Sequence, residues 1–214
     1  MKHADPRLAA YRDLLLAAPV SVTSIGDPER AFAVHVADAL TAIPLIERLA
    51  PGRIADVGSG GGSPGIPVAL TTGIPVDLVE ATGAKCAFLR RCVAALGAPC
   101  EVIHDRSEQL ARAGGRDAYD LVLARALAPP PVAAELCLPL AGVGGHVLLW
   151  TAEMEPGVLA EVAARVGGEH AQTIDVGPNR RLALLRKVAA TPEGFPRRPG
   201  MAAKHPLLRV RSRP

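Results

Sequence analysis

Apolar and polar residues follow two repeating patterns along most of the chain, one typical of buried strands and the other of helices. Short β-branched and apolar runs, which suit strands buried on both faces of a sheet, occur at 53–57, 76–80, 100–104, 119–125 and 145–150. Between them, apolar residues recur with helical spacing at 83–96, 107–113, 130–140 and 156–166. This alternation predicts a mostly parallel sheet with helices on both faces.

The two ends of the chain depart from this alternation. Before residue 50 the spacing predicts two helices, 6–18 and 28–49, the second with Asp27 as its cap and Pro28 in its first turn. Near the other end, 172–176 and 181–187 read as strands joined by four residues, too few for a parallel crossover. We therefore predict an α/β fold with a doubly wound, mostly parallel seven-stranded sheet that ends in an antiparallel hairpin.

A glycine-rich segment follows the first predicted strand. Asp56 ends that strand, glycines stand at 58, 60, 61 and 62, and Pro64 suits the first turn of a new helix. Gly58, Gly60 and Gly62 allow the backbone to turn sharply and to approach a ligand closely. A dinucleotide-binding G-x-G-x-x-G pattern counted from Gly58 would need glycine where Ser63 stands, so the spacing argues against a dinucleotide.

Two carboxylates suggest what this loop binds. Glu80 ends the second predicted strand, twenty-two residues after Gly58, where a carboxylate can accept hydrogen bonds from both hydroxyls of a ribose. Asp56 suits a cation better than a pyrophosphate. A ligand with a ribose, an ammonium and a sulfonium fits both acids, and S-adenosylmethionine is such a ligand. The alternative is a glycine-rich turn with incidental acids.

The net charge of +3 conceals a basic end on an acidic body. Residues 178–214 hold ten Lys or Arg and one acid, Glu193, whereas the other residues hold fourteen bases and twenty acids. This asymmetry suggests a polyanionic partner, most simply nucleic acid. The alternative is a solvated, disordered terminus.

Composition narrows the class of protein. The four cysteines, Cys86, Cys92, Cys100 and Cys137, form no C-x-x-C pair, and no signal peptide or membrane-spanning run is visible. We expect buried thiols, no metal and a monomeric cytoplasmic protein without a membrane partner.

Two further groups of polar residues follow predicted strands. Asp105, Ser107 and Glu108 come after the third strand and are candidates to bind an adenine edge or its amino group. Arg125 ends the fourth strand, which predicts that its side chain faces the cleft. The alternative for Arg125 is that it neutralises Glu80 or Asp56.

Several segments match one known family, and together they span nearly the whole chain. They are 56–67, 85–90, 105–110, Ala124-Arg125-Ala126, and the tail, where Thr191 to Gly200 reads T-P-E-G-F-P-R-R-P-G before Lys204-His205-Pro206-Leu207. Val22-Thr23-Ser24-Ile25 and His35-Val36-Ala37-Asp38 add two N-terminal signatures. In these segments the chain resembles the bacterial 16S ribosomal RNA guanine-N7 methyltransferases (RsmG, also called GidB). It departs from them in lacking a tryptophan and an asparagine before Val22.

The resemblance implies an S-adenosylmethionine-dependent enzyme of the Rossmann-like class I fold, acting on 16S rRNA or the small ribosomal subunit. It implies a helical extension at 1–50, a cofactor-binding domain at 51–188 and a basic RNA-binding tail at 189–214, within one globular domain overall. With the two acids predicted above, the cofactor residues are Asp56, Gly58, Gly60, Gly62, Ser63, Glu80, Ser107, Glu108 and Arg125. The residues expected around the target guanine and the RNA are Arg106, Arg125, Arg180, Arg197, Arg198 and Lys204.

The chemistry of guanine N7 sets the mechanism that we expect. N7 has a free lone pair, so methylation needs no general base, and positioning carries the reaction. The product is cationic, so Arg125 and Arg180 should contact O6, a phosphate or the cofactor carboxylate and not N7. Because A-form RNA hides N7, the target is a loop base or a displaced base. Trp150, Phe195 and Tyr119 are the candidate stacking faces, and Trp150 is the one to test.

Two other functions fit parts of the sequence. A methyltransferase of the same fold with a small-molecule acceptor would leave the basic end without a use. An RNA-binding assembly factor that has lost its chemistry would have no physical need for the glycine loop, Glu80 and Arg125.

Overall fold

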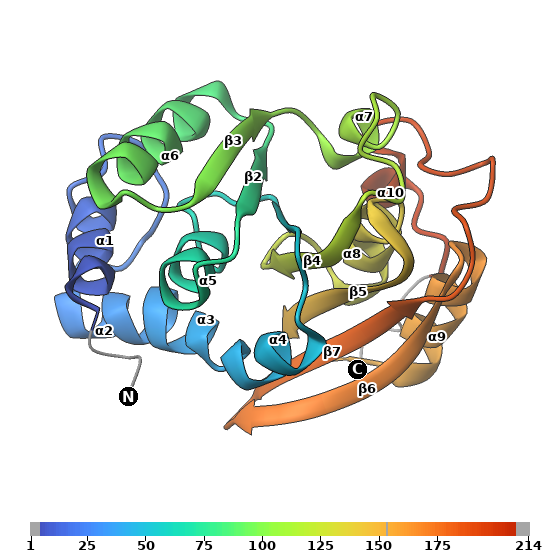
Figure 1. Cartoon of the computed structure of the whole chain (residues 1–214). Helices are drawn as coiled ribbons and strands as arrows, with labels where there is room; N and C mark the ends of the chain where they lie inside the picture. Colours follow the sequence, from blue (N-terminus) through green and yellow to red (C-terminus); the bar gives the residue numbers. More distant parts are fainter. Residues whose placement is uncertain (1–4, 153, 209–214) are drawn as a thin grey trace. The chain divides into compact units, whose positions relative to one another are not determined.

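The computed structural model describes residues 5–152 and 154–208. Its seven strands have the order β3-β2-β1-β4-β5-β7-β6, and Figure 1 shows β7 between β5 and β6. The pairs β1–β2, β2–β3 and β4–β5 are parallel, and β7 runs antiparallel to both β5 and β6. The predicted fold class, a mostly parallel α/β sheet that ends in an antiparallel hairpin, is confirmed. The chain divides into two compact units between Asp105 and Arg106.

The strands of the first unit begin and end close to the predicted positions. They are β1 (Ile54–Val57), β2 (Val76–Glu80) and β3 (Cys100–His104). All four residues of β1 are buried, as are Val76, Leu78 and Val79 of β2. Burial of each Ile, Val or Leu side chain among them contributes roughly 1.5 to 3 kcal/mol, which explains why short apolar runs specify these strands.

The other regular elements of the first unit are helical. They are α1 (Pro6–Leu16), α2 (Pro28–Phe32), the π-helix η2 (Ala33–Ala37), α3 (Asp38–Leu40), α4 (Ile43–Leu49), α5 (Gly65–Thr72) and α6 (Gly83–Leu96). α6 has the predicted bounds and ends at Gly97, whose φ of +57° is left-handed. α1 packs against α2, α5 and α6.

The prediction of one continuous helix over 28–49 is wrong. Asp27 caps its start as expected, because the Asp27 carboxylate accepts the Arg30 N–H at 2.7 Å. The ladder is interrupted at Thr41, whose hydroxyl donates to the Asp38 carbonyl at 2.6 Å. Pro44, in the first turn of α4, has no N–H to continue a ladder. The result is one run made of α2, η2 and α3, followed by the separate helix α4.

The second unit holds the other four strands. Its elements are α7 (Ser107–Leu110), β4 (Tyr119–Arg125), α8 (Pro130–Cys137), β5 (Ala141–Thr151), α9 (Pro156–Arg165), β6 (Gly168–Gly177), β7 (Arg180–Lys187) and α10 (Met201–Lys204). β5 and β6 are longer than predicted. α8 stops before Pro139, which explains why it is shorter than predicted. The core of the second unit includes Leu121, Leu123 and Leu148, all fully buried.

Candidate functional site

The glycine loop leaves β1 and is held against the end of β2. The N–H groups of Gly58 and Ser59 both donate to the Val79 carbonyl, at 2.8 and 3.2 Å. Gly60 has a φ of +55°, and a Cβ added to it would meet only the Gly58 carbonyl oxygen, at 3.8 Å. The loop therefore needs glycine at 60 for its backbone conformation, and the space beside Gly60 is open.

Asp56 braces this loop from inside. It is 1% exposed, and its Oδ2 accepts the N–H of Gly65 at 3.1 Å, at the start of α5. A Cβ at Gly65 would lie 2.7 Å from the same oxygen. These contacts tie the end of β1 to the start of α5. The predicted contact of Asp56 with the cationic end of a cofactor stays a prediction.

Glu80 fastens the loop to the next strand. Its Oε2 accepts the N–H of Gly60 at 3.0 Å, and its Oε1 accepts the N–H of Thr82 at 2.8 Å, just before α6. The residue is 7% exposed. A carboxylate oxygen has two lone pairs, so each oxygen can still accept from a hydroxyl group. The geometry therefore suits the predicted contact with a ribose.

The N-terminal helices support the same loop, which the sequence reasoning did not foresee. The hydroxyl of Tyr11 donates to the Gly61 carbonyl at 3.0 Å, and that of Ser63 donates to the His35 carbonyl at 2.7 Å. His35 Nε2 and Thr23 Oγ1 are 2.8 Å apart. Ser63, predicted as a cofactor residue, is buried and joins the loop to η2. The partners in these two hydrogen bonds are 50 and 28 residues apart in the sequence, and no local spacing pattern signals such contacts.

Two of the three predicted adenine-binding residues, Ser107 and Glu108, lie on α7 in the second unit. Ser107 and Glu108 are buried, and Glu108 Oε1 accepts the N–H of Gly200 at 3.0 Å. Glu108 thus anchors the tail, and its contact with a cofactor stays a prediction. Arg106 precedes α7 and is exposed, whereas Asp105 belongs to the first unit, where its N–H donates to the Glu80 carbonyl.

A pocket of about 320 Å³ lies at the ends of β4 and β5 in the second unit. It brings together three predicted residues, Arg125, Trp150 and Arg180. Arg125 and Trp150 are directly opposite in the β4–β5 register. Arg181, which the sequence reasoning missed, also lines it and donates from Nε to Asp175 Oδ1 at 2.9 Å. One aromatic ring and three guanidinium groups around one cavity suit a planar, electron-rich ring that carries phosphate.

The predicted basic tail is folded against the second unit as far as the structure describes it. Residues 209–214 of that prediction lie outside the described residues. Arg197 donates two hydrogen bonds to the Glu135 carboxylate, at 2.5 and 2.6 Å. The side chain of Glu135 is 3% exposed and that of Arg197 is 22% exposed, so this pair is largely buried. Arg198 and Lys204 are exposed, and RNA contacts by all three stay predictions.

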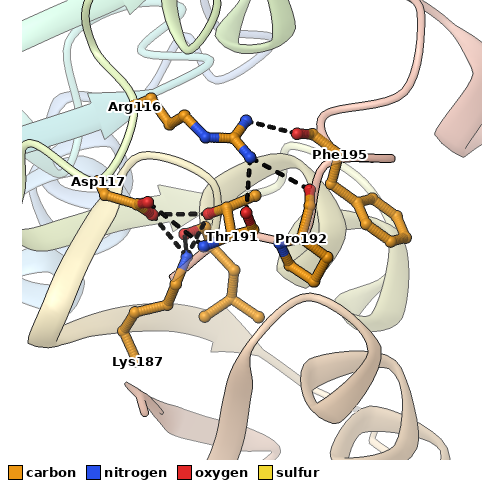
Figure 2. A network of polar contacts seen from close by, with 7 residues as sticks. Arg116, Asp117, Lys187, Thr191, Pro192 and Phe195 are labelled. Carbon is orange, nitrogen blue, oxygen red and sulfur yellow. Dashed lines mark hydrogen bonds and ion pairs between the residues drawn. The ribbon is translucent and has the colours of Figure 1, made fainter. Parts of the chain in front are cut away.

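A buried lysine, Lys187, is hydrogen-bonded to the start of the tail (Figure 2). The Lys187 ammonium donates to Asp117 Oδ1 at 2.8 Å, to the Leu138 carbonyl at 2.7 Å and to Thr191 Oγ1 at 2.5 Å, and its side chain has no exposure. Burial lowers the pKa of Lys187, and the hydrogen bond to Asp117 opposes this shift. Burial acts to raise the pKa of Asp117, but hydrogen bonds from Lys187 and Thr191 outweigh it and hold that pKa below 3.8.

The cysteines do not provide a nucleophile. Cys86, Cys92 and Cys137 are buried and Cys100 is half-buried, and all four are free thiols. Burial raises the pKa of Cys92 to about 11 and that of Cys100 to about 12, so both stay protonated near neutral pH.

The described residues contain neither a metal-binding cluster nor a membrane-spanning helix. Among residues 5–152 and 154–208, no group of three or more His, Cys, Asp or Glu is placed to hold a metal ion. Over the same described ranges, no helix has the length and hydrophobicity to cross a membrane.

Comparison with known proteins gives a consistent result. The family model described as rRNA small subunit methyltransferase G (GidB) matches residues 6–177. A relative from Rubrobacter xylanophilus with that name is 41% identical over 214 residues, 94% of this chain and 80% of the relative. Another, from Pelotomaculum thermopropionicum, is 36% identical over 199 residues, 88% of this chain and 83% of the relative.

The fold has more distant likenesses among solved structures. A putative O-methyltransferase from Klebsiella pneumoniae superposes with a TM-score of 0.58 at 15% identity, over 87% of this chain and 91% of that one. That likeness shows the fold. The family match over residues 6–177 and the identity to these relatives place the chain in the rRNA small subunit methyltransferase G (GidB) family.

Proposed function

We propose that this protein transfers a methyl group from S-adenosylmethionine to N7 of a guanine in the 16S rRNA of the small ribosomal subunit. Family membership supports an rRNA substrate. The observation that supports a guanine as the methyl acceptor is the pocket lined by Arg125, Trp150, Arg180 and Arg181. We also propose that the protein acts as a monomer in the cytoplasm.

S-adenosylmethionine is the cofactor, and it supplies a methyl group already activated on a sulfonium. In the first unit, the glycine loop and Glu80 fit it. Gly60 presents backbone beside open space, and each Glu80 oxygen retains a lone pair for a ribose hydroxyl. Asp56 and Ser63 hold the loop in shape. In the second unit, Ser107, Glu108 and Arg125 are the proposed further contacts.

The acceptor pocket suits a guanine that has left its stack. Trp150 offers an aromatic face on which a base can stack, a contact worth about 1 to 3 kcal/mol. Arg125 and Arg180 can hydrogen-bond O6 or a phosphate oxygen. Because N7 becomes cationic on methylation, these arginines must lie away from N7. No side chain has to remove a proton, so the protein positions N7 and excludes water from the methyl group.

Chemical mapping of 7-methylguanosine tests this proposal. Small-subunit RNA from cells with and without the protein is treated with borohydride and aniline, which cleave the RNA at that base. We expect one cleavage site that disappears without the protein and returns with the wild-type gene. The gene for Trp150→Leu should restore little of it, whereas that for Val143→Ala, at an exposed position outside the pocket, should restore it fully. An identical cleavage pattern in both RNAs would refute the proposal.

A further inference from the structure

A second hollow of about 600 Å³ lies in the second unit, beside the folded tail. We call it the tail groove. Its lining residues are Arg112, Arg116, Glu193, Gly194, Phe195, Pro196, Arg197, Arg198 and Met201. It shares no lining residue with the acceptor pocket. Four arginines and one glutamate make it strongly basic.

Arg116 builds the tail groove by holding backbone of the tail. Its guanidinium donates to the carbonyls of Thr191 at 2.6 Å, Pro192 at 3.1 Å and Phe195 at 2.5 Å (Figure 2). Arg112 donates in the same way to the Pro196 carbonyl at 2.7 Å. Carbonyl groups orient a guanidinium without neutralising it. These two arginines therefore keep their full charge in fixed positions.

The arginines of the tail groove differ in how much charge they leave for a partner. Arg197 is neutralised by Glu135. Within the described ranges, Arg112, Arg116 and Arg198 form no ion pair with a carboxylate. A guanidinium has five N–H donors, so Arg112, with one hydrogen bond, has four left to offer. The groove thus presents at least two exposed cations, Arg112 and Arg198, on a rigid support.

We propose that the tail groove binds the phosphodiester backbone of the rRNA substrate, at a distance along the RNA from the methylated base. This inference rests on the proposed function, because it takes the RNA as the partner. Guanidinium groups bind phosphate oxygens through paired hydrogen bonds. Positions fixed in advance by backbone carbonyls reduce the entropy lost on binding. The groove contributes affinity and leaves choice of the base to the acceptor pocket.

Charge reversal tests this inference. Arg198→Glu removes a cation that has no hydrogen bond to the rest of the described chain, and Arg112→Glu removes one with a single hydrogen bond. Arg112→Gln, which removes the positive charge without adding a negative one, separates loss of charge from charge reversal. Arg48→Glu, at an exposed position on α4, is the matched control with the same change in net charge.

The measurement is binding of a 16S rRNA transcript over a range of salt concentrations. Each groove reversal should weaken binding roughly tenfold at low salt and should reduce the slope of log affinity against log salt by about 0.7 to 0.9. Arg48→Glu should match the wild type, and all variants should bind S-adenosylmethionine normally. Groove variants that match Arg48→Glu would overturn the inference. Displacement of the RNA by polyglutamate as readily as by polyuridylate would also overturn it, because the groove would then favour acidic protein.

A methylation assay with the wild-type protein, run in parallel, keeps the two proposals apart. If the wild type methylates the transcript and the groove variants bind RNA normally, the tail groove fails and the proposed function stands. If the wild type methylates neither the transcript nor small ribosomal subunits while the groove variants lose RNA binding, the proposed function is refuted and the inference about the groove is kept.

Discussion

The glycine loop and the tail are both irregular segments, and side chains hold both by their backbone, but with opposite charges. In the loop, the carboxylates of Asp56 and Glu80 accept backbone N–H groups. In the tail, Arg116 donates to the backbone carbonyls of Thr191, Pro192 and Phe195, and Lys187 donates to the hydroxyl of Thr191. Glu80 and Arg116 each hold a segment and keep their charge, whereas Lys187 is neutralised by Asp117. The loop keeps a negative charge that suits hydroxyl donors and cations, and the tail keeps a positive one that suits a polyanion.

The largest expected effect concerns Lys187, the buried cation at the end of β7 that binds the start of the tail. Lys187→Met leaves the Asp117 carboxylate without the ammonium that compensates it. Removing one partner of a buried pair costs about 3 to 5 kcal/mol of the free energy of unfolding. Urea unfolding checks this value. Lys204→Met, at an exposed position, should change it by less than about 0.5 kcal/mol. Equal effects would show that the Lys187 contacts add no stability.

The pH dependence of stability tests the pair of Lys187 and Asp117 in a second way. The pKa of Asp117 lies below its ordinary value of 3.8 in the folded protein. The folded state therefore binds fewer protons than the unfolded state between these two pKa values. The contribution of Asp117 is complete above pH 3.8 and is lost as the pH falls through the folded-state pKa. The difference in unfolding free energy between wild type and Asp117→Asn should shrink from pH 7 to pH 3. A constant difference would contradict this.

Arg197 and Arg198 are adjacent but differ in role, because Arg197 pairs with a buried carboxylate and Arg198 is exposed to solvent. Arg197→Met leaves the Glu135 carboxylate, 3% exposed, without its partner and should cost about 3 kcal/mol of unfolding free energy. Arg198→Met should cost less than about 0.5 kcal/mol. Thermal and urea unfolding of the two variants measure the contrast. Similar stabilities would mean that the Glu135 pair is not formed in solution.

The corresponding change in the loop acts on binding. Glu80→Gln replaces a carboxylate that accepts two backbone N–H groups, and the new amide N–H₂ cannot accept from either. We expect a loss of about 1.5 to 3 kcal/mol in the binding free energy of S-adenosylmethionine, measured by titration calorimetry. Glu101→Gln, at an exposed position of β3, is the control and should bind like wild type.

The smallest expected effect comes from the backbone of the loop. Gly60→Ala places a Cβ on a residue with a φ of +55°, which costs about 1 to 2 kcal/mol of stability. Gly157→Ala, in α9 with nothing within 4 Å of the added Cβ, should be neutral or stabilising. Urea unfolding compares the two. A stable Gly60→Ala protein would show that the loop relaxes to another conformation.

The sequence predicted the strands well because their signal is local. Apolar runs bounded by Gly, Pro or a charge define β2, β3 and β4 at the observed bounds. The acids at strand ends were found by the same local reasoning, and Arg125, Trp150 and Arg180 do line one pocket. Helix ends were less accurate where Thr41 or Pro139 interrupts an apolar pattern.

The supports of both irregular segments could not be predicted. Tyr11 and Gly61 are 50 residues apart, and Arg116 and Thr191 are 75 apart. Such contacts join a side chain to a carbonyl oxygen, which every residue has, so neither partner carries a recognisable sequence pattern. The charge of the tail was visible in the sequence. Its division between Arg197, which is neutralised, and Arg198, which is not, depends on the fold.

The order in which a polypeptide is synthesised gives the Arg116 contacts a further meaning. The residues whose hydrogen bonds hold the glycine loop have all been synthesised once Glu80 and Thr82 have been added to the growing chain. The carbonyls that Arg116 grasps, at 191, 192 and 195, arrive more than a hundred residues later. A translation product that ends before residue 191 lacks these carbonyls and therefore has no tail groove beside Arg116.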